Sequence, residues 1–402
     1  MKVVAVETVR VPQHPEYVWV LVETDEGLVG TGETMPRVGP VERVVHDVLA
    51  PLLVGADPAP EPFWQRAFQA LAYHGYAGAE LRALSAVDIA LWDVLGQAAG
   101  LPVHRLLGGP CRDRVPVYNT CVSHGAIRDH ERFLGTAAGP DGAGALAREL
   151  VDEGFSAMKI WPFDNHSVAS GGQRITNEQL AQACRSLAAI RDSVGDAIEI
   201  ALEGHSCWNL PSAVRIARAL EEFRPLWLED LLPAGDPGAW AELRRSTTTP
   251  ICGSERLFTR YGLAPFLDAH ALDIVKQDLC WTGGFTEFAK LAALAAAREL
   301  PVAPHNCHGP VGAMATLHAS AAIPNLYLME SVRAFSRGFH ADLVDTPPVI
   351  DAGFAIVPER PGLGLRLRDD VLAVAARVRT DQTTTTGWAA GDPWAGQLGD
   401  RV

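Results

Sequence analysis

Leu226-Trp227-Leu228-Glu229 is a short apolar run that ends in a glutamate, and the same arrangement recurs on both sides of it. Upstream, Ile198–Leu202 precedes Glu203, and downstream, Cys252-Gly253-Ser254 precedes Glu255. Positions 203, 229 and 255 are separated by 26 residues in each interval, which fits one strand and one helix per step. We therefore predict three consecutive parallel strands with a carboxylate at the C-terminal end of each.

The same rhythm continues over most of the chain after residue 115. Short apolar runs alternate with amphipathic stretches, which is the pattern of parallel βαβ units. The expected strands are Val115–Asn119, Ala157–Trp161, Ile198–Glu203, Leu226–Glu229, Pro250–Gly253, Asp273–Gln277, Pro301–Ala303 and Leu326–Met329. The expected helices between them include Asn177–Asp192, Leu210–Phe223, Phe285–Arg298 and Gly312–Ala321. Eight strands indicate a closed α/β barrel of the TIM type, in which the C-terminal strand ends face the active site.

The segments that flank the barrel have a different pattern. Residues 1–120 are predicted to form an α+β domain, with strands at Val3–Val11 and Tyr17–Glu23 and helices at 41–53, 62–71 and 83–96. Residues 121–346 are the predicted barrel domain. Residues 347–402 contain loops and a short helix, and the Thr-, Gly- and Ala-rich stretch from residue 380 is expected to be a mobile tail.

The composition limits the class of function. The 402 residues, 48% of them hydrophobic, suffice for a barrel of about 250 residues and a smaller partner domain. The net charge of -14 argues against nucleic acid, because a basic surface is needed to release phosphate counterions. The seven cysteines contain no C-x-x-C pair, and no run reaches the roughly 18 apolar residues of a membrane span. We expect a soluble, reduced, cytoplasmic protein without nucleic-acid or membrane partners.

The three strand-end glutamates predict a metal site. If the barrel forms, Glu203, Glu229 and Glu255 converge on one side of its mouth, where like charges repel unless a cation is present. Hard carboxylate oxygens select Mg²⁺, which also keeps positions for water and substrate. A single glutamate at a strand end is more often a solvated rim residue or an ion-pair partner. Three of them at equal spacing favour the metal.

The next strand ends carry groups suited to proton transfer. Asp278 and His305 end adjacent predicted strands, and an aspartate bonded to one ring nitrogen fixes the tautomer and raises the basicity of the histidine. This pair is a candidate general base near neutral pH. Glu330 ends the last strand and is a candidate to stabilise a developing oxyanion. Lys159 ends the second strand and is a candidate to neutralise a substrate carboxylate.

Several other residues admit two interpretations. His205 lies two residues after Glu203 and is either a general acid for a departing hydroxyl or the start of a loop. Trp161 and Trp208 either stack on a sugar or pack in the core. His305-Asn306-Cys307-His308 matches no common zinc-ligand spacing. The run Gly30-Thr31-Gly32-Glu33 lacks the third glycine of a dinucleotide fingerprint.

The residues resemble the enolase superfamily, specifically its mandelate racemase/muconate lactonizing enzyme subgroup. The resemblance spans nearly the whole chain. It includes Glu26-Gly27-Leu28-Val29-Gly30-Thr31-Gly32-Glu33 as a cap hairpin, Ala86-Val87-Asp88-Ile89-Ala90-Leu91-Trp92-Asp93 as a cap helix, Leu106-Leu107-Gly108-Gly109 as its exit, and Pro361-Gly362-Leu363-Gly364 as the C-terminal return to the cap. It implies a (β/α)7β barrel with an α+β capping domain built from both ends of the chain.

The family pattern also implies roles for the site residues. It implies that Glu203, Glu229 and Glu255 bind Mg²⁺, that Asp278 and His305 form the base dyad, and that Glu330 stabilises the enediolate, a chemistry known for this superfamily. Many members carry Lys-x-Lys at the end of the second barrel strand, where the second lysine is an opposed base. This sequence has Lys159-Ile160-Trp161, so a one-base reaction with His305 as the base is favoured over a two-base racemisation.

With His205 after the third strand, the pattern is similar to sugar-acid dehydratases of the D-galactonate type. This implies loss of the C2 proton to His305 and protonation of the leaving 3-hydroxyl by His205, which gives a 2-keto-3-deoxy acid. Glu203 departs from the commoner aspartate at its position. The alternatives are an epimerase, racemase or lactone cycloisomerase of the same superfamily, and a non-catalytic ligand-binding barrel. The resemblance further implies a homo-oligomer, with specificity for a small carboxylate set by cap loops at Pro12–Tyr17, Thr34–Val38 and Tyr73–Gly78.

Overall fold

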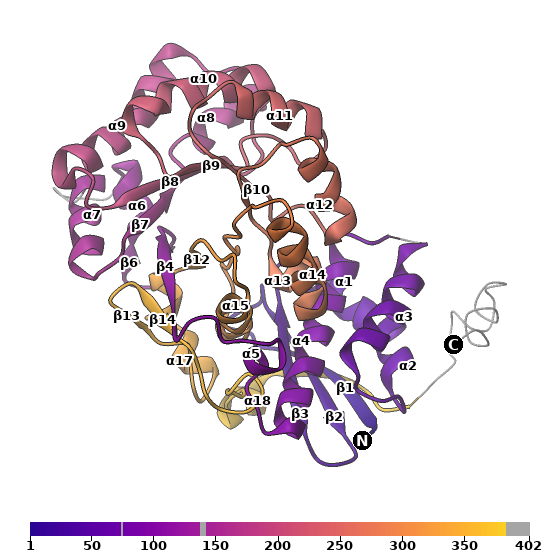
Figure 1. The fold of residues 1–402 in the computed structure, drawn as a ribbon. Helices are drawn as coiled ribbons and strands as arrows, with labels where there is room; N and C mark the ends of the chain where they lie inside the picture. Colours follow the sequence, from indigo (N-terminus) through magenta and orange to yellow (C-terminus); the bar gives the residue numbers. More distant parts are fainter. Residues whose placement is uncertain (74, 137–141, 383–402) are drawn as a thin grey trace.

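A computed structural model describes residues 1–73, 75–136 and 142–382 and shows a closed parallel barrel (Figure 1). Its strands lie side by side in the order β11-β10-β9-β8-β7-β4, and β12 pairs with the other edge of β4. Val302 forms parallel bridges to Val275 and Leu326 and completes the ring between β11 and β12. The strands are β4 (Arg114–Thr120), β7 (Ala157–Ile160), β8 (Glu199–Glu203), β9 (Trp227–Glu229), β10 (Ile251–Gly253), β11 (Ile274–Val275) and β12 (Met329–Ser331). The predicted fold class is confirmed.

Helices alternate with these strands and cover the outside of the barrel, as Figure 1 shows for α9 to α12. They bury apolar faces against the strands, and α9, α10 and α11 begin with a side-chain N-cap. Thr176 and Gln179 form a reciprocal capping box on α9, and Asn209 caps α10. The long outer helices are α7 (Ala143–Asp152), α9 (Asn177–Val194), α10 (Leu210–Leu220), α11 (Pro237–Arg245), α12 (Thr259–Asp268), α14 (Gly284–Ala296) and α15 (Pro310–Ala322).

The cap contains an antiparallel sheet in the order β15-β1-β2-β3, flanked by helices. Gly30 and Gly32 on β3 face helix α4, where a Cβ would lie 2.0 Å from the Ala90 carbonyl oxygen and 1.8 Å from that of Ala86, respectively. The two glycines therefore allow a strand and a helix to pack backbone to backbone. The elements are β1 (Val3–Arg10), β2 (Val18–Thr24), β3 (Val29–Thr34), α1 (Val38–Val44), a π-helical turn (Val45–Leu49), α2 (Ala50–Leu53), α3 (Pro60–Ala72), α4 (Ala79–Ala99), α5 (Val103–Leu106) and β15 (Ala376–Thr380).

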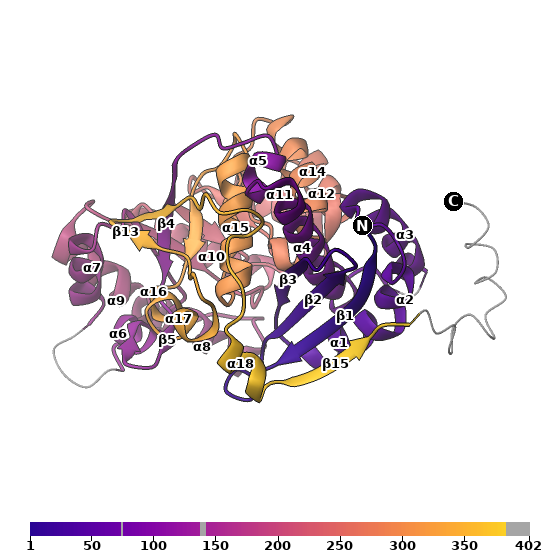
Figure 2. The same ribbon diagram turned by 90° about the horizontal axis from the view of Figure 1, so that it is seen from below.

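Both ends of the chain meet in the cap, as the resemblance implied. β15 pairs antiparallel with β1, and Figure 2 shows the two strands side by side. The carboxylate of Asp93 on α4 accepts hydrogen bonds from Thr31 N on β3 and Leu363 N in the returning segment, at 2.9 and 2.8 Å. Residues 383–402, which include most of the predicted mobile tail, lie outside the described residues.

The cap is joined to the barrel by buried polar contacts. Trp64 on α3 donates to the Gly283 carbonyl at 2.9 Å, and Thr34 donates to that of Cys280 at 2.9 Å. Asp88 on α4 accepts from Thr286 N on α14 at 3.0 Å. These contacts place β3, α3 and α4 of the cap against α13 (Leu279–Thr282) and α14, the two helices that follow Asp278.

Strand β4 falls within residues 1–120, the predicted cap domain, but it belongs to the barrel sheet. Within the described ranges, none of the helices combines the length and apolarity that a membrane crossing requires. All seven cysteines are free thiols, in line with a reduced protein. The short elements are β5 (Ser123–His124), β6 (Ile127–Arg128), α6 (Asp129–Leu134), α8 (Asp164–Ser167), α13 (Leu279–Thr282), α16 (Arg333–Ser336), α17 (His340–Leu343), β13 (Ile350–Asp351), β14 (Phe354–Ile356), α18 (Asp369–Val374) and 3-10 turns at Val168–Ser170 and Glu221–Phe223.

Candidate active site

The position of the site follows from strand alternation. The barrel interior is filled by a buried cluster that takes one side chain from each of seven segments around the ring. The cluster consists of Tyr118, Ala157, Ala201, Trp227, Cys252, Ile274 and Ala303, and the partly buried Leu328 before β12 packs against it. Because inward-facing residues recur every second position, the next inward layer lies closer to the mouth. That layer contains Thr120, Lys159, Glu203, Glu229, Lys276 and His305. An apolar floor thus supports a layer of polar and charged residues.

The three predicted metal ligands come together. Glu203, Glu229 and Glu255 are all buried, and each offers a carboxylate oxygen within 4.8 Å of the others. Glu203 accepts hydrogen bonds from Gly204 N and His205 N at 3.0 and 2.6 Å, which orient its carboxylate. Burial and the neighbouring Glu229 raise the pKa of Glu203 well above its usual value. Within the described residues, Glu255 Oε2 is buried without a hydrogen-bond partner. An all-carboxylate donor set with an unsatisfied oxygen fits Mg²⁺.

Two buried lysines in the same layer balance this negative charge. Lys159 Nζ lies 2.6 Å from Glu229 Oε1, 2.9 Å from Glu330 Oε1 and 3.3 Å from Glu203 Oε2. Lys276 Nζ lies 3.2 Å from Glu330 Oε2 and donates to the Tyr118 hydroxyl at 2.5 Å. Burial opposes ionisation of Glu229, but the two lysines outweigh it and lower its pKa to about 2. Lys159 therefore lies beside two of the three candidate metal ligands, and its role toward a substrate carboxylate stays a prediction.

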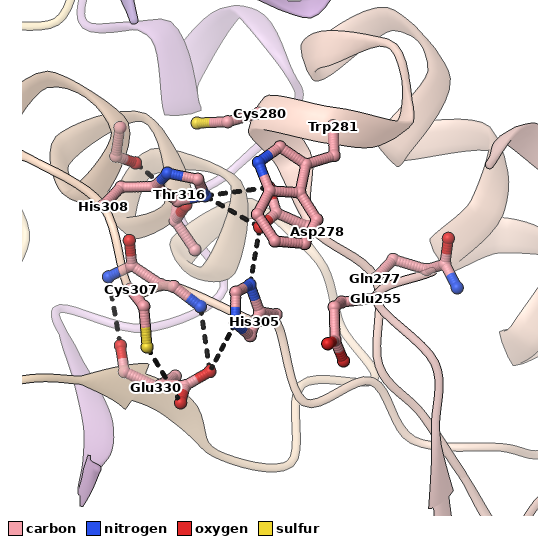
Figure 3. Close-up of polar contacts among 12 residues, drawn as sticks. Glu255, Gln277, Asp278, Cys280, Trp281, His305, Cys307, His308, Thr316 and Glu330 are labelled. Atoms are coloured by element: carbon pink, nitrogen blue, oxygen red, sulfur yellow. Dashed lines mark hydrogen bonds and ion pairs between the residues drawn. The ribbon is translucent and has the colours of Figure 1, made fainter. Parts of the chain in front are cut away.

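Asp278 and His305 form the predicted dyad (Figure 3). Asp278 Oδ2 accepts a hydrogen bond from His305 Nδ1 at 2.5 Å, so His305 Nε2 is the nitrogen left to accept a proton. His305 Nε2 lies 3.9 Å from Glu330 Oε2, and its ring lies 5.1 Å from that of Trp281. Burial opposes ionisation of Asp278, yet His308 and His305 lower its pKa to about 2. The carboxylate that orients the base is therefore ionised.

Glu330 is held from several sides. It receives hydrogen bonds from Thr120 Oγ1, from Asn306 N at 3.0 Å and from Cys307 Sγ at 3.5 Å. Burial raises its pKa, but Lys159 and Lys276 outweigh burial and hold the pKa well below its usual value. Its fixed position next to both His305 and Lys159 fits the predicted location beside a developing oxyanion.

His205 lies on another side of the mouth in a left-handed backbone conformation (φ 44°). Its Nδ1 donates to Asp164 Oδ2 at 2.5 Å, and 42% of its side chain is exposed. Its ring meets the edge of Trp161 at a centroid distance of 5.8 Å. His205 therefore begins the loop after β8, and its ring is oriented by the Asp164 carboxylate. Its role as a general acid stays a prediction.

The two predicted sugar-stacking tryptophans differ. Trp161 is half-buried, stacks on His130 at 5.2 Å and contacts His205, so it lies at the mouth. Trp208 is 1% exposed and packs in the core between the barrel and its helices. The stacking interpretation of Trp208 is therefore corrected to packing, because neither face of its ring is open to a ligand.

Two of the predicted cap loops reach the mouth. The ring of His14 lies 4.6 Å from that of Phe339, which follows β12, and Trp281 Nε1 donates to the Met35 carbonyl at 2.7 Å. The guanidinium of Arg82 on α4 lies 4.6 Å above the Trp281 ring. In the third loop, Tyr76 packs on Phe68, and residue 74 lies outside the described ranges.

Three residues at the mouth were not predicted from the sequence: Lys276, Asp164 and His308. Lys276 could have been found from alternation, because it lies two residues before Asp278 on an inward-facing position. Asp164 lies in the short helix after β7 and reaches His205 only through the fold. His308 donates from Nε2 to Asp278 Oδ2 at 2.8 Å and Oδ1 at 3.0 Å. Neither the Asp164–His205 contact nor the His308–Asp278 contact leaves a recognisable spacing in the sequence.

Fold and site together define a class of capped α/β-barrel proteins that carry a buried carboxylate cluster able to hold a metal ion and a hydrogen-bonded His–Asp pair at the mouth. Residues 2–108 match the family model for the mandelate racemase/muconate lactonizing enzyme N-terminal domain, and residues 142–371 match that for the enolase C-terminal domain-like family. The chain belongs to the enolase superfamily, in its mandelate racemase/muconate lactonizing enzyme subgroup.

Named relatives and solved structures agree with this assignment. A D-xylonate dehydratase of Haloferax volcanii is 33% identical over 377 residues, covering 91% of this chain and 87% of the relative. A D-galactonate dehydratase of Xanthomonas oryzae is 32% identical over 370 residues, covering 89% and 90% of the two chains. A crystal structure of an enolase of the mandelate racemase subgroup from Agrobacterium tumefaciens has a TM-score of 0.87 and 38% identity, covering 95% of this chain and 99% of that one.

Proposed function

We propose that this enzyme is a Mg²⁺-dependent hydro-lyase that dehydrates a sugar acid, an aldonate or an aldarate, to a 2-keto-3-deoxy acid. The observation that carries the proposal is the pair of carboxylate-oriented histidines, His305 on Asp278 and His205 on Asp164, that accompany the Glu203–Glu229–Glu255 site. Dehydration needs one group that removes a proton and a second that donates one to the leaving hydroxyl. The similarity to relatives named as sugar-acid dehydratases supports the same reaction class.

Each side chain has a defined task in this proposal. Glu203, Glu229 and Glu255 hold Mg²⁺, which when bound supplies Lewis-acid stabilisation of negative charge on the substrate carboxylate. Lys159 places a second positive charge beside that carboxylate. His305 Nε2 removes the C2 proton, and Asp278 keeps the Nδ1 proton in place. His205, with its Nδ1 bound to Asp164, presents Nε2 to protonate the leaving 3-hydroxyl.

Trp161 favours dehydration over two-base racemisation. An opposed base is expected two residues after Lys159, and the side chain there is an indole that packs on His130 and His205. An indole has no basic nitrogen, because its only nitrogen is a donor. In this proposal His205, as a general acid, is the group that acts on the substrate from the side opposite His305.

The test is a panel of aldonates and aldarates incubated in D₂O with the Mg²⁺-loaded protein and followed by NMR. We expect a 2-keto-3-deoxy product that carries deuterium at C3, and no product with the His305→Asn variant. Exchange at C2 without a keto product would replace dehydration by epimerisation or racemisation. Absence of both Mg²⁺ binding and turnover would leave the non-catalytic ligand-binding barrel.

A further inference from the structure

Asp278 is shared by two imidazoles, and the proposed reaction uses only one of them. Its Oδ2 accepts from both His305 Nδ1 and His308 Nε2, and its Oδ1 accepts from His308 alone. Figure 3 shows Asp278 between the two rings. The ring centroids of His305 and His308 are 6.1 Å apart and the rings are nearly perpendicular, at 86°. Trp281 contacts both rings, at 5.1 and 5.8 Å, and holds them apart.

His308 is fixed in place beside the Asp278 carboxylate. It is 1% exposed and begins the turn into α15, and its carbonyl accepts a hydrogen bond from His340 Nε2 at 3.2 Å. Burial opposes its charged form, but the charge of Asp278 outweighs burial and raises the pKa of His308 well above its usual value. An ionised Asp278 paired to a cationic His308 is a locally neutral pair behind the base.

We propose that His308 is a positioning residue that holds Asp278 against His305 and offsets the Asp278 charge, so that His305 stays unprotonated and able to act as a base at lower pH. The inference rests on His305 being the base of the proposed function. It adds that this site orients the base with a His–Asp–His triad rather than a dyad.

Electrostatics give the direction of the effect. A carboxylate that faces a single histidine favours its imidazolium form, and Glu330 at 3.9 Å acts in the same direction. A positive charge about 6 Å away opposes that form by an amount equal to about one to two pH units at an effective dielectric constant of about 20–40. The positive charge of His308 thus opposes the combined effect of the Asp278 and Glu330 carboxylates on His305.

The groups that face the pair from other elements do not replace His308. Burial lowers the pKa of His340 to about 4 and raises that of Cys280 to about 11, so both are neutral near pH 7. Other ionisable groups near the pair include Glu330 on β12, which is itself paired with Lys159 and Lys276, Arg82 on α4 and Glu33 on β3. The Arg82 guanidinium lies 4.6 Å above the Trp281 ring, and burial raises the pKa of Glu33.

The experiment compares His308→Gln and His308→Leu with the matched control His318→Gln. A glutamine keeps a donor for Asp278 without a charge, and a leucine removes both. His318 is also a fully buried histidine, but it lies near the C-terminal end of α15 beside His104, and burial lowers its pKa to about 3, so its substitution removes no charge. The readouts are the titration of His305 in long-range ¹H–¹⁵N spectra of the Mg²⁺-loaded protein and, with an active substrate, the pH profile of kcat/KM.

In the wild type we expect an imidazolium signal for His308 at pH 7. In His308→Gln the titration midpoint of His305 and the acidic limb of kcat/KM should move up by about one to two pH units. His308→Leu should add a fall in kcat, and His318→Gln should leave both readouts unmoved. A neutral His308 signal in the wild type would overturn the inference, and this measurement does not depend on the folding of a variant. An unchanged titration of His305 in His308→Gln would overturn it as well. A shifted His305 without turnover of any sugar acid would instead overturn the proposed function.

Discussion

Two sets of buried carboxylates, one on helix α4 of the cap and one at the barrel mouth, are equally hidden from water but differ in charge. On α4, Asp88 at the contact with the barrel and Asp93 within the cap accept hydrogen bonds from backbone N–H groups, and burial raises their pKa values to about 7 and about 6. At the mouth, Glu229 and Asp278 meet buried cations, which outweigh burial and lower both pKa values to about 2.

The difference shows that the partner, rather than the depth, decides whether a buried carboxylate is ionised. Backbone N–H groups donate to Asp88 Oδ2 and to both oxygens of Asp93 but bring no full charge, so these side chains join elements together. The lysines and histidines at the mouth bring full positive charges and favour the ionised forms of Glu229 and Asp278. An ionised carboxylate is what a metal ligand or a group that orients a base requires.

The largest effect is expected from removing the base at the mouth. His305→Asn keeps a polar side chain beside Asp278 but has no nitrogen that accepts a proton. General-base catalysis contributes about 10²–10⁴-fold, and no second base is predicted, so turnover should fall by at least that factor. The measurement is C2 proton exchange in D₂O together with product formation. His270→Asn, at an exposed turn position, is the control and should retain full activity; residual exchange at the wild-type rate in His305→Asn would point to another base.

The next effect is expected from the metal site. Glu229→Gln removes one carboxylate ligand and leaves Lys159 and Lys276 without their shared partner. Loss of an outer-shell partner alone costs about 10–100-fold in metal affinity, so loss of a ligand should cost more. Calorimetric titration with Mg²⁺ measures this, and Mg²⁺ should raise the melting temperature of the wild type but not of the variant.

Glu287→Gln is the matched control for the metal site. Glu287 is a fully buried carboxylate paired with Arg260 at 2.6 Å on the outside of the barrel, so its substitution should leave Mg²⁺ binding intact. Equal weakening in both variants would mean that loss of stability, rather than loss of a ligand, is responsible.

The comparison also explains what the sequence predicted. Glu203, Glu229 and Glu255 were found because a repeated strand–helix unit places equivalent positions at one end of a barrel, so chain spacing becomes spatial proximity. His305 and Asp278 were found for the same reason. The fold, including the cap built from both chain ends, was predicted by these spacings and by the family resemblance.

Other features depend on contacts that spacing does not encode. Asp164 and His308 act through hydrogen bonds between segments of unrelated position in the strand repeat. Trp208 lies close in sequence to His205, but the loop after β8 turns it into the core. The sequence shows Asp88 and Asp278 only as two aspartates. The opposite shifts of their pKa values depend on their partners in the fold.

A smaller effect is expected at the interface, where Asp88 makes stability depend on pH. The raised pKa means that the folded state binds this proton more tightly than the unfolded state, so stability is fully present below about pH 4 and declines as the pH rises to about 7. Relative to Asp88→Asn, which does not titrate, the wild type should lose up to about 1.4 kcal/mol per pH unit in that window. Urea unfolding at pH 4.5 to 7.5 measures the difference, in which the titration of Asp93 cancels; parallel curves would mean that Asp88 is already ionised at low pH.

The smallest effect is expected from an exposed ion pair across the same interface. Lys290 on α14 contacts Glu61 on α3 at 2.7 Å, and the side chains are 32% and 52% exposed. Solvent screens such pairs, so Glu61→Gln should change the free energy of unfolding by less than about 1 kcal/mol, with less effect still at high salt. A double-mutant cycle with Lys290→Met isolates the pair. A coupling well above 1 kcal/mol would show that surface charge, and not the buried contacts of Asp88 and Trp64, fixes the cap on the barrel.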